Sequence, residues 1–195
     1  KPVAALRGKP NSSMHVGLKL QLEGKSDAFV SAGNTGAQMA ISTVVLRLHH
    51  SVARPAIATV FPTSREPIVV VDSGANVDCS PTELVQFARL GVAYAESVFG
   101  RTNACVGLLS IGEERTKGTE VTREAYDLLE KSSVNFIGNV EGRDILQAKA
   151  DVVVCDGFVG NVILKFTESL GSVFRRHIKR QIGKKIFVNL GAFLM

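Results

Sequence analysis

The sequence has 195 residues, 45% of them hydrophobic and 21% charged, and a net charge of +5 at pH 7. This length suffices for one sizeable core, and the longest apolar runs, such as Ile68–Val71, are far shorter than the roughly 18 residues of a membrane-spanning helix. Three widely spaced cysteines, with no Cys-x-x-Cys pair, argue against a disulfide framework or a zinc site and fit a reducing cytoplasm. The amino terminus lacks the long apolar region of a signal peptide, so we expect it to be mid-domain sequence.

Short β-rich runs alternate with longer stretches of helical periodicity, which is typical of βα units in a parallel sheet. Most of the runs are continuously apolar, as expected for strands covered on both faces. The strands predicted in this way are Ala28–Ser31, Ala56–Val60, Ile68–Asp72, Val106–Ile111, Asn135–Ile137 and Asp151–Asp156. The sequence therefore predicts a single α/β domain with a mostly parallel sheet.

Three helices have recognisable boundaries. One begins near Asn34 and ends at His49–His50, whose imidazoles favour the negative end of a helix dipole. A second begins with Ser80 as N-cap and Glu83 three residues later, which is a capping box. The last begins near Phe158, runs past Arg176 with an apolar side toward the core, and is followed by a basic and then an apolar segment.

Glycine-bearing loops follow five of the predicted strands, and ligands of open parallel sheets bind beyond the carboxyl ends of the strands. Glycine permits close approach of the backbone, and helix amino termini offer free amides, so these loops suit an anion such as phosphate. Each glycine alone also fits an ordinary turn; five loops together favour a site. The candidate phosphate- and substrate-binding residues are Ser31, Gly33, Asn34, Thr35, Gly36, Asp72, Gly74, Asn76, Gly112, Glu113, Asn139, Glu141, Asp156, Gly157 and Gly160.

Two further residues are candidates for catalysis. Lys117 lies in a polar loop, where its ammonium either neutralises bound phosphate or is simply solvated. Asn161 stands at a helix start, where its carboxamide either donates to a developing oxyanion or caps the helix. The carboxylates at the strand ends are more often held by neighbouring amides than used as general bases. Phosphate is itself partly dianionic near neutrality, so it attacks a thioester without an enzyme nucleophile.

Five segments together closely resemble the PlsX family of phosphate acyltransferases. They are Ser31–Ala37, Asp72–Asn76, Leu108–Glu114 with Lys117-Gly118, Gly138–Ile145 and Asp151–Lys165. The resemblance implies transfer of a fatty acyl group from acyl carrier protein to inorganic phosphate, with no organic cofactor. We also expect no metal site and no nucleic-acid partner. The resemblance also implies a homodimer and a three-layer α/β/α fold related to phosphotransacetylase and isocitrate dehydrogenase, and it matches Lys117 and Asn161 to catalytic positions.

The resemblance covers about residues 2–185 and implies that residues 1–195 are one acyltransferase domain lacking family segments at both ends. Residues 158–195 then correspond to a long helix and the start of a protruding, dimer-forming arm. Ser110 stands where asparagine is usual in the family, Ser73 where an apolar residue is usual, and Ser169 where glycine is usual. These differences bear on fine specificity and not on the class of reaction.

The basic end of the last helix suggests a partner. Arg175, Arg176, Lys179 and Arg180 suit acidic acyl carrier protein or, with the apolar residues of Phe187–Met195, an anionic membrane surface. The alternative is a solvated helix end whose apolar tail packs in a dimer. Two other functions stay open at this point: a coenzyme A-dependent phosphotransacetylase, and a non-catalytic module that binds anions or an acidic protein.

Overall fold

A computed structural model describes residues 8–182 of the chain. The elements, in chain order, are α2 (Ser13–Leu22), α3 (Thr35–Val45), β1 (Ala58–Phe61), β2 (Ile68–Val71), α4 (Pro81–Phe99), β3 (Cys105–Leu109), α5 (Glu120–Glu130), β4 (Asn135–Val140), α6 (Gly142–Leu146), β5 (Val152–Val154) and α7 (Gly157–Ile182). None of the helices in this part of the chain is both long and apolar enough to span a membrane. The last segment of the sequence, Phe187–Met195, lies outside the described residues.

The strands form one sheet in the order β1-β2-β5-β3-β4. Strand β1 is antiparallel to β2, and the other neighbouring strands are parallel. Strand β5 lies at the centre, where Val153 is paired with Val70 on one side and with Gly107 on the other. The predicted α/β class with a mostly parallel sheet is confirmed. Five of the six predicted strands are present, with ends shifted by a few residues.

Helices cover both faces of the sheet because successive side chains of a strand point to opposite faces. In β2, Val69 and Val71 pack in a buried cluster with residues of α4 and α5. Ile68 and Val70 pack on the other face, in a cluster that includes residues of α6 and the first turns of α7. All four side chains are buried, as the continuous apolar run predicts.

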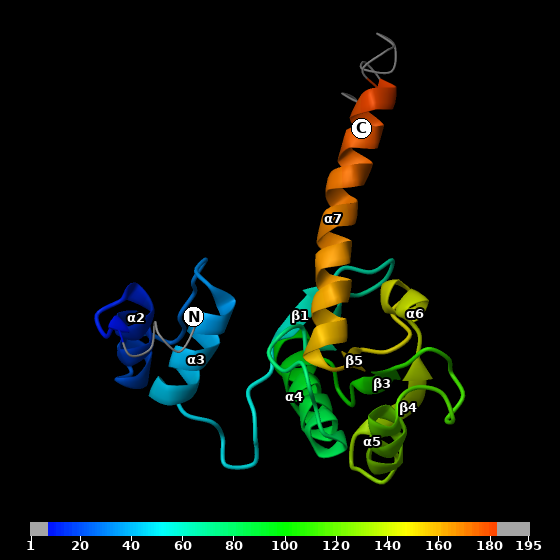
Figure 1. The fold of residues 1–195 in the computed structure, drawn as a ribbon, viewed down its shortest axis with the longest axis horizontal. Coiled ribbons are helices and arrows are strands. Elements are labelled where there is room, and N and C mark those ends of the chain that lie inside the picture. The colour runs from blue at the N-terminus through cyan, green and yellow to red at the C-terminus, as the bar shows by residue number, and fades with distance from the viewer. Residues whose placement is uncertain (1–7, 183–195) are drawn as a thin grey trace.

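The helix starts predicted at Ser80 and near Phe158 are confirmed. Ser80 Oγ accepts a hydrogen bond from the Glu83 amide, and the Glu83 carboxylate accepts one from the Ser80 amide, so the capping box at the start of α4 is complete. Helix α7 begins at Gly157, one residue before the predicted start, and runs well past Arg176. In Figure 1 it projects far from the sheet.

The amino-terminal part of the chain differs from the prediction. Residues 28–31 form no strand, because Phe29 packs over Gly17 of α2 and Val30 is 93% exposed. Helix α3 ends at Val45, short of the predicted end at His49–His50. Helices α2 and α3 pack on each other and stand apart from the sheet, joined to it by an extended connection (Figure 1).

Candidate functional site

The loop that follows β2 is organised around a buried carboxylate. Asp72 is fully buried, and its Oδ1 accepts hydrogen bonds from the amides of Ile57, Gly74 and Ala75 at 3.0, 3.1 and 3.0 Å. Its Oδ2 accepts from the amide and the side chain of Asn76 at 2.7 and 2.9 Å. With its carboxylate thus occupied, Asp72 shapes the loop instead of offering a free ligand for phosphate.

The start of α7 packs directly on this loop. A side chain at Gly157 would meet the Asn76 backbone at 2.7 Å, and one at Gly160 would collide with the Asp72 carbonyl oxygen. Asp156 caps the helix, since its Oδ1 accepts from the Val159 amide at 2.8 Å. The two glycines therefore permit close contact between the loop and the helix start.

Asn161 lies at this contact. A Cβ atom built on Gly74 would stand 3.4 Å from Asn161 Oδ1, so the carboxamide lies beside the Asp72–Asn76 loop. Asn161 is exposed, and the helix-capping bond at the start of α7 is made by Asp156. The structure thus leaves the Asn161 side chain at the surface of the loop contact, where it can meet a ligand.

Lys117 lies in the loop that follows β3. Its aliphatic part lies close to Gly112, where a Cβ atom would stand 2.9 Å from Lys117 Cγ. The side chain is exposed and has no ion-pair partner among residues 8–182. Asn139 lies in β4 and is 6% exposed. Its Nδ2 donates to the Glu114 carbonyl at 2.9 Å, which ties the Lys117 loop to β4. Asn139 therefore supports the Lys117 loop.

Charged groups surround the same loop. Glu113 Oε1 lies 2.6 Å from Lys149 Nζ and 3.9 Å from the Arg143 guanidinium. Glu141 lies 3.3 Å from the same guanidinium, and its amide donates to Asp144 Oδ2 at 2.8 Å. The hydrogen bond that Lys149 donates to Glu113 raises the pKa of Lys149 above its ordinary value. Two candidate substrate-binding residues, Glu113 and Glu141, are thus already paired with basic groups.

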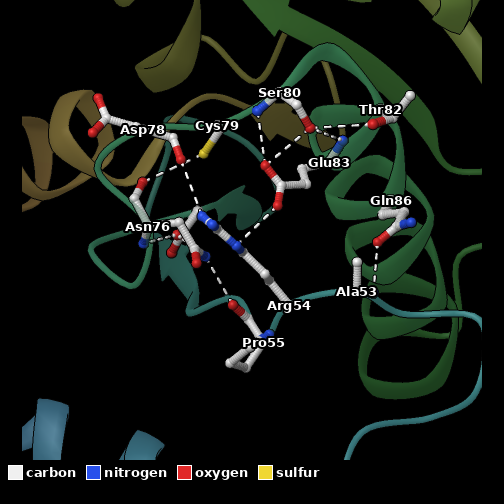
Figure 2. Close-up of polar contacts among 11 residues, drawn as sticks. Ala53, Arg54, Pro55, Asn76, Asp78, Cys79, Ser80, Thr82, Glu83 and Gln86 are labelled. Atoms are coloured by element: carbon white, nitrogen blue, oxygen red, sulfur yellow. Dashed lines mark hydrogen bonds and ion pairs between the residues drawn. The ribbon is translucent and has the colours of Figure 1, made fainter.

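The extended connection from α3 also contacts the Asp72–Asn76 loop, through contacts that the sequence patterns did not indicate (Figure 2). Arg54 lies 3.0 Å from the Glu83 carboxylate and donates to the Asp78 carbonyl at 3.2 Å. Asn76 Nδ2 donates to the Pro55 carbonyl at 2.8 Å. No motif signals Arg54, because its role depends on a contact between residues far apart in the chain.

The first of the five predicted loops does not join the others. Ser31 and Gly33 lie between α2 and α3, and Gly36 lies in the first turn of α3; both helices stand apart from the sheet (Figure 1). Asn34 caps α3, since its Oδ1 accepts from the Ala37 amide at 2.9 Å. Thr35 lines a cavity of about 420 Å³ between α3 and the extended connection. The expectation that all five loops converge is therefore wrong for this one, because no strand precedes it.

The remaining four loops do meet at the carboxyl edge of the sheet. Two neighbouring cavities, of about 300 and 320 Å³, lie there and share Thr119, Thr122 and Asp156 in their walls. Thr119 is the N-cap of α5, a position that the Thr119-Glu120 pair could have indicated. Residues 8–182 contain no group of three or more His, Cys, Asp or Glu side chains placed to hold a metal ion.

Two cysteines lie near these cavities. Burial raises the pKa of the Cys79 thiol to about 11, and burial raises that of Cys155 further. Both thiols are therefore neutral near pH 7 and poor nucleophiles. Cys155 is 5% exposed and packs with the apolar cluster on the α7 side of the sheet. Cys155 is therefore a packing residue.

Comparison with known proteins decides the family. The model of the family described as fatty acid synthesis protein matches residues 1–195. The chain belongs to this family. A phosphate acyltransferase of Desulforamulus reducens is 52% identical over 94% of the chain, and one of Aquifex aeolicus is 48% identical over all of it. The resemblance to PlsX phosphate acyltransferases is thereby confirmed.

The chain spans somewhat more than half the length of these relatives, 55% and 58% respectively. Two solved structures show a similar fold. The EutD phosphotransacetylase from Staphylococcus aureus has a TM-score of 0.61 at 20% identity and covers 82% of this chain and 56% of its own. A phosphotransacetylase from Streptococcus pyogenes has a TM-score of 0.63 at 18% identity and covers 80% of this chain and 54% of its own. This fatty acid synthesis family member therefore has a phosphotransacetylase-like fold.

Proposed function

We propose that this family member takes part in acyl transfer from acyl carrier protein to inorganic phosphate. A phosphate oxygen attacks the thioester carbonyl carbon, the carbon–sulfur bond breaks, and the carrier leaves as a thiolate that takes up a proton. The products are an acyl phosphate and the free carrier thiol. The acyl phosphate then serves phospholipid synthesis. The names of the relatives support an acyltransferase that uses phosphate.

One observation carries the proposal for this chain. The Asp72–Asn76 loop and the Gly157–Asn161 helix start, two of the family-like motifs, are in direct contact at the carboxyl edge of the sheet. The amide of Gly157 donates to the Asn76 carbonyl at 2.7 Å, which fixes the contact. A rigid contact of this kind suits a reaction in which the protein positions two substrates and stabilises charge.

Within this reaction, we assign Lys117 to phosphate binding and Asn161 to the oxyanion. The exposed ammonium of Lys117 has no carboxylate partner in the described part of the chain, so its charge is available to an anion. The Asn161 amide group can donate a hydrogen bond to the carbonyl oxygen as it becomes negative. Phosphate supplies the nucleophile, so no protein nucleophile is required.

The roles are tested by steady-state kinetics of acyl phosphate formation. Lys117→Ala should mainly raise the KM for phosphate, whereas Asn161→Ala should lower kcat by about 10²-fold. Lys131→Ala, an exposed lysine at the far end of α5, is the matched control and should behave as wild type. Wild-type constants in both site variants would refute the assignment.

The acyl donor is identified in the same assay. Acyl carrier protein thioesters should support acyl phosphate formation, and coenzyme A thioesters should be poor donors. Efficient turnover with coenzyme A thioesters alone would instead make the protein a phosphotransacetylase-type enzyme. No acyl phosphate from either donor would leave a non-catalytic anion-binding module.

We further propose a cytoplasmic homodimer with the isocitrate dehydrogenase-like, three-layer arrangement, in which α7 begins the protruding arm. In support, α7 carries exposed apolar side chains along its length, including Phe158, Phe166 and Phe174, each about 60% exposed (61%, 62% and 62%). Docking of acyl carrier protein and contact with an anionic membrane are proposed for the basic end of the same helix, which carries Arg175, Arg176, Lys179 and Arg180, all exposed.

A further inference from the structure

The smaller of the two cavities at the sheet edge has an apolar wall. Its volume is about 300 Å³, and its apolar lining comes from Leu109, Ile111, Cys155, Val159 and Ile163. The only ionisable groups in the lining are Asp156, whose carboxylate caps α7, and the Cys155 thiol, which burial keeps neutral. The wall therefore suits an uncharged, apolar ligand.

One polar atom in this lining has no partner. Ser110 Oγ is buried and is the only buried side-chain nitrogen or oxygen within residues 8–182 that makes no hydrogen bond. A buried hydroxyl without a partner costs about 1–3 kcal/mol. It lies next to Gly118, where a Cβ atom would come within 2.9 Å of it. A ligand oxygen at this point would satisfy the hydroxyl.

The position of the cavity relates it to the proposed chemistry. Gly118 follows Lys117 directly in the chain, and Asp156 precedes the Gly157–Asn161 helix start. Both Gly118 and Asp156 line the cavity. The cavity thus lies between the two loops that carry the proposed catalytic residues. Ile111, at its wall, is 83% exposed, so the cavity is open to solvent on that side.

We propose that this cavity binds the alkyl chain of the acyl substrate, and that Ser110 donates a hydrogen bond to the acyl carbonyl oxygen. The inference rests on the proposed acyl transfer and names the place of the fatty chain within it. An uncharged wall receives the methylene groups, and the single unsatisfied hydroxyl marks the polar end of the same ligand. Ser110 is then a substrate-binding residue at the acyl carbonyl.

The first test fills the cavity. Val159→Phe should lower kcat/KM for a palmitoyl donor relative to a butyryl donor by about tenfold or more, since small changes in an apolar pocket have effects of this size. The KM for phosphate should stay unchanged. Val162→Phe is the matched control, because Val162 is 52% exposed, lies on the same helix and is absent from the cavity wall. Equal chain-length profiles in the two variants would overturn the proposal.

The second test removes the hydroxyl. Ser110→Ala breaks no hydrogen bond in this structure, so its melting temperature should not fall. Its kcat/KM should fall about three- to tenfold, because the variant loses one hydrogen bond to the substrate, which contributes about 0.5–1.5 kcal/mol. Undiminished kcat/KM in this folded variant would refute the role of Ser110.

A binding measurement separates this proposal from the proposed function. Calorimetry with palmitate should show binding to the wild type and to Val162→Phe, and weakened binding to Val159→Phe. If the wild type forms no acyl phosphate but this pattern holds, acyl transfer is rejected and the alkyl pocket stands. If acyl phosphate forms but palmitate binds both variants equally, the pocket is rejected and the function stands.

Discussion

At the scale of single residues, Asp72 has the densest set of polar contacts at the sheet edge. Its carboxylate accepts from four backbone amides and one side-chain amide, and its carbonyl oxygen faces Gly160. The sequence offered two interpretations of Asp72: it binds substrate, or it fixes neighbouring amides. The structure shows the second. Asp72 therefore contributes to function by fixing the shape of the loop that follows β2.

Replacing Asp72 should consequently destabilise the fold. Asp72→Ala leaves five donors without their acceptor inside the protein, and hydrogen bonds to charged groups contribute about 1.5–3 kcal/mol each. We expect a loss of at least about 3 kcal/mol in the free energy of unfolding, measured by urea denaturation. Asp78→Ala, an exposed aspartate in the same loop, should cost under about 0.5 kcal/mol. Equal losses in the two variants would contradict this role for Asp72.

At the scale of elements, the start of α4 combines a local capping motif with a tertiary contact. The Ser80–Glu83 capping box is readable from the sequence, because it depends on residues three apart. The Glu83 carboxylate also lies 3.0 Å from Arg54, which brings the extended connection against the helix (Figure 2). The hydrogen bond from the Ser80 amide is the main cause that lowers the pKa of Glu83, with Arg54 adding to it.

The lowered pKa of Glu83 implies a pH-dependent contribution to stability. A carboxyl whose pKa is lower in the folded state stabilises the fold above its ordinary value of 4.5, and this contribution is lost as the pH falls through the folded-state pKa. Glu83→Gln should therefore cost about 1 kcal/mol at pH 7 and progressively less below about pH 4.5, measured by denaturant unfolding. Glu96→Gln, a substitution at an exposed position of the same helix, is the control. A cost that is independent of pH would contradict the prediction.

The strands show which patterns suffice for prediction. Runs that are buried on both faces, such as Ile68–Val71 and Val152–Val154, were correctly predicted, because continuous apolar sequence is what a central strand requires. The run Ala28–Ser31 has a similar composition, but its Phe29 packs on Gly17 of α2 and no strand lies beside it. A strand needs a neighbour, and the sequence of the strand alone does not specify one.

The candidate site also has features that the sequence predicts and features that depend on tertiary contacts. Close approach at Gly157 and Gly160 was expected from the glycines, although what approaches them is the Asp72–Asn76 loop. The contacts of Arg54 and the unsatisfied hydroxyl of Ser110 depend on packing between distant segments, so no local pattern indicated either. The sequence predicts where glycine permits close approach of the backbone, and the fold determines which residues make that approach.

At the scale of the whole molecule, α7 is the feature that most clearly extends beyond the globular part (Figure 1). Val162, Phe166 and Val173 are each more than half exposed, so an apolar surface runs along the helix. The basic residues lie toward its far end. A helix with this distribution of charge suits an acidic partner that approaches from solvent.

Charge reversal tests this use of α7. Replacing Arg176, Lys179 and Arg180 by Glu should raise the KM for acyl carrier protein and flatten its dependence on salt, since exposed charges act over about 8 Å at physiological ionic strength. If the helix instead contacts membranes, binding to anionic vesicles should fall. Replacing the exposed Lys19, Arg89 and Lys131 by Glu makes the same change in net charge elsewhere and is the control. If both triple variants behave alike, the basic helix end is not a docking surface.

The central place of β5 has a consequence for how the chain is made. Strands β1 and β2 form one pair and β3 and β4 another, and β5 is the strand that joins them. A ribosome that has delivered the first four strands has therefore delivered two separate halves of a sheet. Val71 ends β2 and Val154 ends β5, a separation of 154 − 71 = 83 residues. At about 5–20 residues per second, the half-sheet waits roughly 4–17 seconds for its central strand, and during that interval the apolar edge of β2 has no partner.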